Sequence, residues 1–198
     1  MPHIHEKPGQ HDITASAFII REDEGATRCL VHYHRKADVL LQIGGHVDPE
    51  VSPWQAMVGE LSEEAGYALG DLEVLQFTAD RIKEHGIVAQ PVPFAILTEP
   101  VGDEHLHDDL CYGFIAIDAP SHEIHEGESK DLRWLTYEEL ALLAETGEMI
   151  PNVLGIYAFL LSHLDSLARI PAREFSLATP TEPILTYKRG RPGEATPR

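Results

Sequence analysis

The sequence predicts an α/β fold in which helices cover both faces of a mixed β-sheet, an α/β/α sandwich. Strand-like segments stand on both sides of a central amphipathic helix, and two further helical segments follow the last strand. The chain has 198 residues, of which 43% are hydrophobic, and this suffices for one compact domain with a core. We expect that domain over residues 13–168, between a flexible N-terminus (1–12) and a C-terminal tail (169–198).

Six segments have the composition and alternation of β-strands. The first two, 13–20 and 27–35, flank the turn sequence REDEG and therefore predict a hairpin. A short apolar segment, 38–43, then leads into Gly44 and Gly45. The remaining strands are expected at 72–82, 92–99, 110–118 and 131–135.

Three segments carry helix signals, and the strongest is 53–65. Ser52 is a good N-cap, Gln55 completes a capping box, and Gly66 is a natural C-terminal stop. Pro53 fits the first helical position. The two later helices are expected at 136–145, where Thr136 and Glu139 form another capping box, and at 151–170.

The charge balance restricts the class of partner. Acidic residues number 33 and basic residues 15, so the formal net charge is −18. Such a surface repels phosphate backbones, which excludes a nucleic-acid polymer as the expected partner. A small anionic substrate is compatible if a divalent cation neutralises the local field. No apolar run of about 18 residues and no signal-peptide pattern is present, so we expect a cytoplasmic protein that does not cross a membrane.

The C-terminal tail differs from the body in charge and composition. From Ser166 onward six basic and three acidic residues give about +3, against about −21 for the rest of the chain. Five prolines in the tail predict an extended arm. Its apolar piece PILTY either docks on the body or a second subunit, or stays loose. The two cysteines, Cys29 and Cys111, lie in strand-like segments and are expected to be reduced core thiols.

The helix 53–65 carries three carboxylates close together. Its apolar residues form one stripe, and Glu60, Glu63 and Glu64 fall within an arc of about 100° beside it. These carboxylates repel one another and face the negative end of the helix dipole. A hard divalent cation, Mg²⁺ or Mn²⁺, offsets both costs. A solvated acidic face is the alternative, but the Gly-Gly turn, the capped start and the E-E-x-G ending favour a metal site.

The stretch GGHVDPEVSPWQAMVGELSEEAGY resembles the Nudix box, the signature of the Nudix hydrolases. Gly45 is the first glycine of that pattern, and the later matches are Glu60, Leu61, Glu63, Glu64, Gly66 and Tyr67. Val51 and Gly59 stand where the family has a glutamate and an arginine. The absence of both the glutamate and the arginine is physically consistent, because the absence of only one would leave the other charge unpaired. The similarity extends over about residues 13–145 and implies a Nudix-type sandwich.

The resemblance also implies the chemistry. Nudix enzymes hydrolyse a nucleoside diphosphate linked to another moiety, and they use Mg²⁺ or Mn²⁺. It assigns Glu60, Glu63 and Glu64 as catalytic and metal-binding residues, with the backbone carbonyl of Gly44 as a further metal ligand. The general base stays open among Glu60, Glu126 and Glu128. The missing Glu and Arg predict weaker support for the metal ligands.

A second polar pattern lies in EHLHDDLCY. In a strand, His105, His107 and Asp109 would share one face, where they could bind a transition metal or line a substrate pocket. A polar strand end is the alternative. By resemblance to similar H-x-H-x-D segments beside a GGH loop, we expect His46, His105 and His107 to bind substrate.

Three hypotheses of function follow. The first is a metal-dependent pyrophosphohydrolase acting on a small nucleotide-like substrate, which the three box glutamates favour. The second is a catalytically impaired Nudix-fold binding module, which Val51 and Gly59 favour. The third is a His-based transition-metal site. The substrate is left open, and so is the oligomeric state, although Nudix domains often form homodimers.

Overall fold

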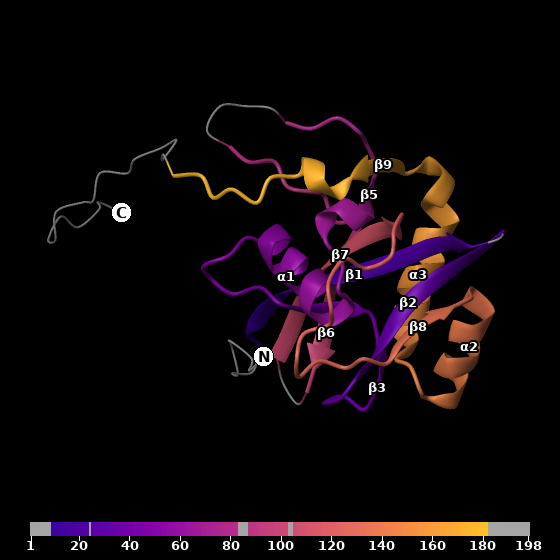
Figure 1. Ribbon diagram of the computed structural model, residues 1–198. Coiled ribbons are helices and arrows are strands. Elements are labelled where there is room, and N and C mark those ends of the chain that lie inside the picture. Colours follow the sequence, from indigo (N-terminus) through magenta and orange to yellow (C-terminus); the bar gives the residue numbers. More distant parts are fainter. Residues whose placement is uncertain (1–8, 24, 83–86, 103–104, 182–198) are drawn as a thin grey trace, which may run out of the picture.

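The computed structural model describes residues 9–23, 25–82, 87–102 and 105–181 of the chain. Nine strands form one sheet, and its main path runs β3-β2-β1-β7-β5-β9 (Figure 1). Off this path, β4 pairs with β1, β6 with β7 and β8 with β2. The strands are β1 (His11–Asp23), β2 (Ala26–His34), β3 (Val39–Leu41), β4 (Ile43–His46), β5 (Leu72–Gln76), β6 (Ala95–Val101), β7 (His105–Ala116), β8 (Leu132–Leu135) and β9 (Ala168–Pro171).

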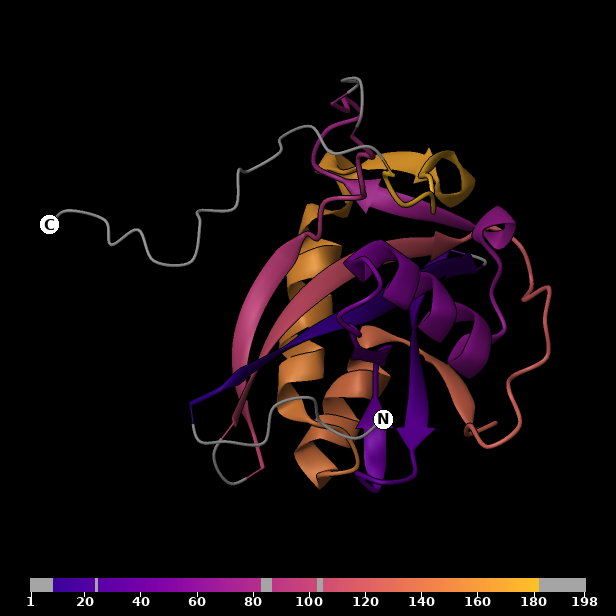
Figure 2. The same ribbon diagram turned by 90° about the vertical axis from the view of Figure 1, so that its left-hand side faces the viewer.

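The sheet is mixed, because β1 and β7 run parallel while the other named strand pairs are antiparallel. Helix α1 (Pro53–Ala65) lies on one face, and α2 (Tyr137–Thr146) and α3 (Pro151–His163) lie on the other (Figure 2). The predicted α/β/α sandwich around a mixed sheet is therefore confirmed. No helix within the described residues is long and apolar enough to span a membrane.

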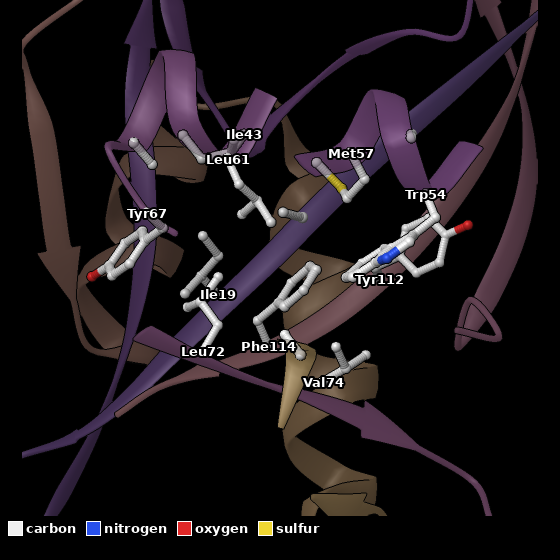
Figure 3. Packing of buried hydrophobic residues seen from close by; sticks show 14 of the residues in the cluster. Ile19, Ile43, Trp54, Met57, Leu61, Tyr67, Leu72, Val74, Tyr112 and Phe114 are labelled. Carbon is white, nitrogen blue, oxygen red and sulfur yellow. The ribbon is translucent and has the colours of Figure 1, made fainter. Parts of the chain in front are cut away.

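Each face of the sheet has its own hydrophobic core, because alternate residues of a strand point to opposite faces. Ala15, Ala17 and Ile19 of β1 join the cluster under α1, whereas Phe18 and Ile20 join the cluster under α3. Figure 3 shows the α1 side, where the buried side chains of Trp54, Met57 and Leu61 pack over Phe114, Val74 and Ile19. Cys29 and Cys111 are buried and free.

Helix α1 has the bounds that its end signals predict. The Ser52 hydroxyl accepts a hydrogen bond from the Gln55 N–H, and the Gln55 side chain accepts one from the Ser52 N–H. Gly66 ends the helix at φ 71°, and a Cβ there would lie 2.4 Å from the carbonyl oxygen of His122. Glycine is therefore required at this position both for its backbone conformation and for the close approach of a loop.

The strand expected over 72–82 ends earlier, at Gln76. The Gln76 side-chain amide donates to the Val92 carbonyl (3.0 Å) and accepts from the Val92 N–H (2.9 Å). A side chain thus provides the pairing that a continuing strand would have provided, and Phe77 is 54% exposed. The next strand, β6, accordingly begins at Ala95, three residues later than expected.

The single helix expected over 151–170 is also wrong over its last seven residues, 164–170. Helix α3 ends at His163, and after a short 3-10 turn the chain forms β9, which pairs with β5. The reason is pairing with a distant strand, since Ile170 of β9 stands opposite Val74 of β5 and is buried in the core under α1. The predicted boundary between domain and tail, at residues 168 and 169, falls inside β9.

The chain stays packed beyond this boundary. Phe175 is buried with its ring 5.9 Å from that of Trp54, and the Leu177 carbonyl accepts a hydrogen bond from the Gln55 side chain (2.9 Å). Of the predicted flexible N-terminus, residues 1–8 lie outside the described residues, and β1 begins at His11. The segment PILTY, within 182–198, also lies outside them.

Candidate active site

Helix α1 presents its glutamates to the backbone of β4. The buried Glu64 accepts a hydrogen bond from the Gly44 N–H on Oε2 (3.0 Å). A Cβ on Gly45 would lie 2.2 Å from Glu60 Oε1, and one on Gly44, at φ 153°, would lie 2.4 Å from the Ala15 carbonyl oxygen. Gly45 is therefore required for Glu60 to lie against β4, and Gly44 is required for the close approach of β4 to β1. The expected role of the Gly44 carbonyl as a metal ligand stays a prediction.

Burial and mutual repulsion make the carboxylates hard to ionise together. Burial, and then the charges of Glu63, Glu128 and Asp48, raise the pKa of Glu60 to about 7. Burial raises the pKa of Glu64 to about 8, against the opposing hydrogen bond from Gly44, with further contributions from Glu60, Glu128 and Glu63. Glu63 is exposed. A set of oxygen donors with an excess of negative charge fits a hard divalent cation.

The loop between β7 and β8 covers the C-terminal end of α1. The His125 N–H donates to the Glu63 carbonyl (2.8 Å), and the His122 N–H donates to the Gly66 carbonyl (2.9 Å). Glu128 belongs to this attached loop. Its charge contributes to the raised pKa values of both Glu60 and Glu64. Glu126 is exposed and is not among the charges that raise either pKa. The two loop carboxylates thus differ in their electrostatic effect on the box, and the identity of the general base stays a prediction.

A buried histidine also contacts the site, although the sequence did not assign it there. His32 of β2 is 2% exposed, and its Nε2 lies 3.7 Å from Glu64 Oε2. Burial, and then the nearby His34, lower the pKa of His32 to about 4, so the contact is not an ion pair at neutral pH. The sequence feature that could have indicated this contact is the alternation His32-x-His34 on a strand next to the box. The same alternation is equally compatible with a purely structural role for both histidines.

The two departures from the box, Val51 and Gly59, lie at open positions of the structure. Val51 is 38% exposed, just before the first turn of α1. A Cβ on Gly59 would meet nothing within 4 Å, so the helix surface there is open. The departures therefore remove a supporting pair without creating a cavity.

The predicted substrate-binding histidines gather on the opposite face from Glu60. Thr14 of β1 pairs with His46, and Ala15 pairs with Gly45, so these two positions of β4 point to different faces. The ring centroids of His46 and His107 are 4.8 Å apart, and those of His105 and His107 are 5.1 Å apart. The three histidines thus form one cluster, and their role in substrate binding stays a prediction.

The glycines of the site offer a matched pair of substitutions. In Gly45→Ala the new methyl group displaces the Glu60 carboxylate, which is the movable end of a side chain, so the fold should persist. We expect the rate of hydrolysis to fall by about 100-fold, since an error of about 1 Å in the position of a catalytic group has that effect.

Gly59→Ala is the matched control, because it lies in open space within the same helix. It should raise the free energy of unfolding by about 1 kcal/mol and leave the activity unchanged. Steady-state kinetics and urea unfolding would measure both, and equal activities would contradict the role of Gly45.

The raised pKa values predict how stability depends on pH. The ordinary value for both Glu60 and Glu64 is 4.5, and the folded values are about 7 and about 8. The folded protein therefore holds these protons more tightly than the unfolded chain, and this stabilisation is complete below pH 4.5 and disappears as the pH rises to about 8. We expect chelator-treated protein to lose thermal stability between pH 5 and pH 8, and added Mg²⁺ to restore it at pH 8. Glu64→Gln should flatten this slope, whereas the exposed Glu138→Gln should leave it unchanged.

Comparison with known proteins identifies the family. The family model described as "NUDIX domain" matches residues 10–153. The chain therefore belongs to the Nudix family, and the predicted family and fold are confirmed. A search of curated proteins gave no match.

Solved structures share the fold at low sequence identity. A Nudix-family hydrolase from Clostridium perfringens superposes with a TM-score of 0.60 at 24% identity, covering 77% of this chain and 97% of its own. The Ap4A hydrolase of C. elegans gives 0.52 at 18% identity, covering 76% and 98%. A Nudix hydrolase from Nitrosomonas europaea gives 0.51 at 18% identity, covering 84% and 97%.

Proposed function

We propose that this protein is a divalent-metal-dependent hydrolase that cleaves the pyrophosphate bond of a small nucleoside diphosphate derivative. The observation that carries the proposal is the convergence of Glu60 and Glu64 on the glycines of β4, with Glu63 exposed beside them. The family membership and the likeness to an Ap4A hydrolase support it. The acidic surface is compatible with such a substrate only if a cation neutralises the charge between them.

The carboxylates of Glu60, Glu63 and Glu64 would hold Mg²⁺ or Mn²⁺. When bound, the ion neutralises the charge that develops on the pyrophosphate oxygens during in-line displacement. The Gly44 N–H keeps Glu64 in position through its hydrogen bond, and the neutral His32 packs against the same carboxylate. These contacts hold the carboxylate oxygens of Glu64, which would bind the metal, in place before a substrate binds.

Glu128 is our candidate for the general base. The attacking water must lose a proton as its oxygen bonds to phosphorus, and the bridging oxygen then leaves with the other phosphate. The Glu128 carboxylate can accept that proton, because its loop is held on α1 and its charge acts on both Glu60 and Glu64. Glu60, the box candidate, is better used as a ligand because it lies against Gly45 inside the cluster.

The test is a panel of nucleoside diphosphate derivatives, including dinucleoside polyphosphates, ADP-ribose and sugar nucleotides. We expect release of a nucleoside monophosphate or phosphate from at least one of them with Mg²⁺ or Mn²⁺, and none after chelation. Turnover that persists in chelator would contradict metal dependence.

Val51 and Gly59 favour a second candidate, the binding module. If the folded protein binds Mn²⁺ and a nucleotide but turns over no member of the panel, the binding module replaces the hydrolase. The double variant Val51→Glu with Gly59→Arg would then test the cause, since it returns the supporting pair that the family usually has. Activity gained in that variant would assign the impairment to these two positions.

A further inference from the structure

We propose that Asp12, His105 and His107 hold a transition-metal ion of the Zn²⁺ class, with His46 as a fourth donor, at a site separate from the box glutamates. One donor atom from each of Asp12, His105 and His107 lies within 4.8 Å of the other two. The His46 Nε2 lies 3.7 Å from Asp12 Oδ2.

The two-histidine part already has the geometry of a metal site. The Nε2 atoms of His105 and His107 are 3.2 Å apart. Two nitrogens bound at about 2.0 Å to a tetrahedral ion would be separated by about 3.3 Å. Asp12 lies at most 4.8 Å from them, so a shift of about 1.5 Å toward the ion completes a three-ligand set. Without metal, the same 3.2 Å contact serves as a hydrogen bond between the two rings.

Strand register brings these donors together from three parts of the chain. In the parallel pair of β1 and β7, Asp12 stands opposite His107, and His105 is two residues earlier on the same face. In the antiparallel pair of β1 and β4, His46 stands opposite Thr14, which shares the face of Asp12. The starts of β1 and β7 lie side by side at one end of the sheet (Figure 2). The donors are thus attached to strands and not to loops.

The donor types distinguish this site from the one on α1. Imidazole nitrogens with one carboxylate suit zinc and similar ions, whereas the all-carboxylate set of the box suits Mg²⁺ or Mn²⁺. The Asp12 side chain is fully buried beside the imidazoles, and a cation bound there would neutralise its charge.

Asp109, which the strand pattern grouped with His105 and His107, is not the carboxylate of this site. Its Oδ1 accepts hydrogen bonds from the hydroxyls of Thr14 and Ser16, each at 2.9 Å. It is therefore engaged by its neighbours on β1, and Asp12 takes the place next to the histidines.

The experiment is a Zn²⁺ titration of the full-length protein after chelator treatment, in competition with a chromophoric chelator and in excess Mg²⁺ to occupy the box. We expect one tightly bound Zn²⁺ per chain and, with Co²⁺, the visible absorption of a tetrahedral N/O site. The variant His105→Gln with His107→Gln, and separately Asp12→Asn, should weaken Zn²⁺ binding by at least about 100-fold. Circular dichroism without metal would show that both variants fold.

Three control variants make the result specific. Zn²⁺ affinity should be unchanged in His122→Gln, which alters an exposed loop histidine, and in Glu63→Gln with Glu64→Gln, which alters the box. It should also be unchanged when His3 and His5, outside the described residues, are replaced together. Unchanged affinity in the His105 and His107 variant, or a loss in the His3 and His5 variant, would overturn the site. The glutamate variant separates the two proposals, because it should abolish hydrolysis and leave Zn²⁺ binding intact.

Discussion

Replacing Glu64 with glutamine should reduce hydrolysis by at least about 10³-fold, because several kcal/mol of transition-state stabilisation depend on the metal that its charge helps to hold. The substitution keeps the shape of the side chain, and the amide oxygen can still accept the hydrogen bond that the Gly44 N–H now donates at 3.0 Å. The fold should therefore persist while the ligand charge is lost. Steady-state kinetics on the best substrate of the panel would measure the effect, with Mn²⁺ affinity followed in parallel.

Glu138→Gln is the matched control for this variant. Glu138 is an exposed glutamate in the first turn of α2, on the other face of the sheet. Its replacement should change neither turnover nor Mn²⁺ affinity. A Glu64→Gln enzyme that retains more than about a tenth of wild-type turnover would show that the box glutamates do not carry the catalytic metal.

Replacing Glu128 with glutamine should lower kcat by about 10²–10⁴-fold with little change in KM, since a general base acts on the chemical step. Glutamine cannot accept the proton of the attacking water, but it fits the same half-buried position. Mn²⁺ affinity should stay constant or fall only slightly, because Glu128 is not one of the proposed ligands but its negative charge near Glu60 and Glu64 attracts a cation.

Glu126→Gln, two residues away and exposed, provides the comparison for Glu128. Both substitutions remove one charge from the same loop, so a general electrostatic effect would appear in both. If Glu126→Gln lowers kcat as much as Glu128→Gln, neither is the specific base. If neither variant lowers kcat, Glu60 becomes the candidate base.

Features that depend on neighbouring residues were readable from the sequence. Helix α1 has its predicted bounds, Pro53–Ala65, because Ser52, Gln55 and Gly66 act within one turn of the helix ends. The position of Glu60, Glu63 and Glu64 on one side of that helix follows from helical periodicity alone. The match to the box then identified the family, which the comparison with known proteins confirms.

Features that depend on residues far away in the chain could not be predicted from the sequence. The strand that begins at Leu72 ends at Gln76 because a side chain pairs with Val92, and this depends on a contact 16 residues away. Residues 168–171 form a strand instead of a helical turn because β5 offers an open edge. Neither partner leaves a local signal in the pattern of apolar residues.

Local periodicity and end signals were enough to predict the α/β class, the glutamate helix and the strand alternation of His105 and His107. Long-range packing placed His32 beside Glu64 and brought Asp12 together with His105 and His107, and the choice of Glu128 as general base stays a proposal. These features depend on the parallel register of β1 with β7 and on the hydrogen bonds that hold a loop on α1. Such contacts are set by packing between segments far apart in the chain, which one segment's composition does not encode.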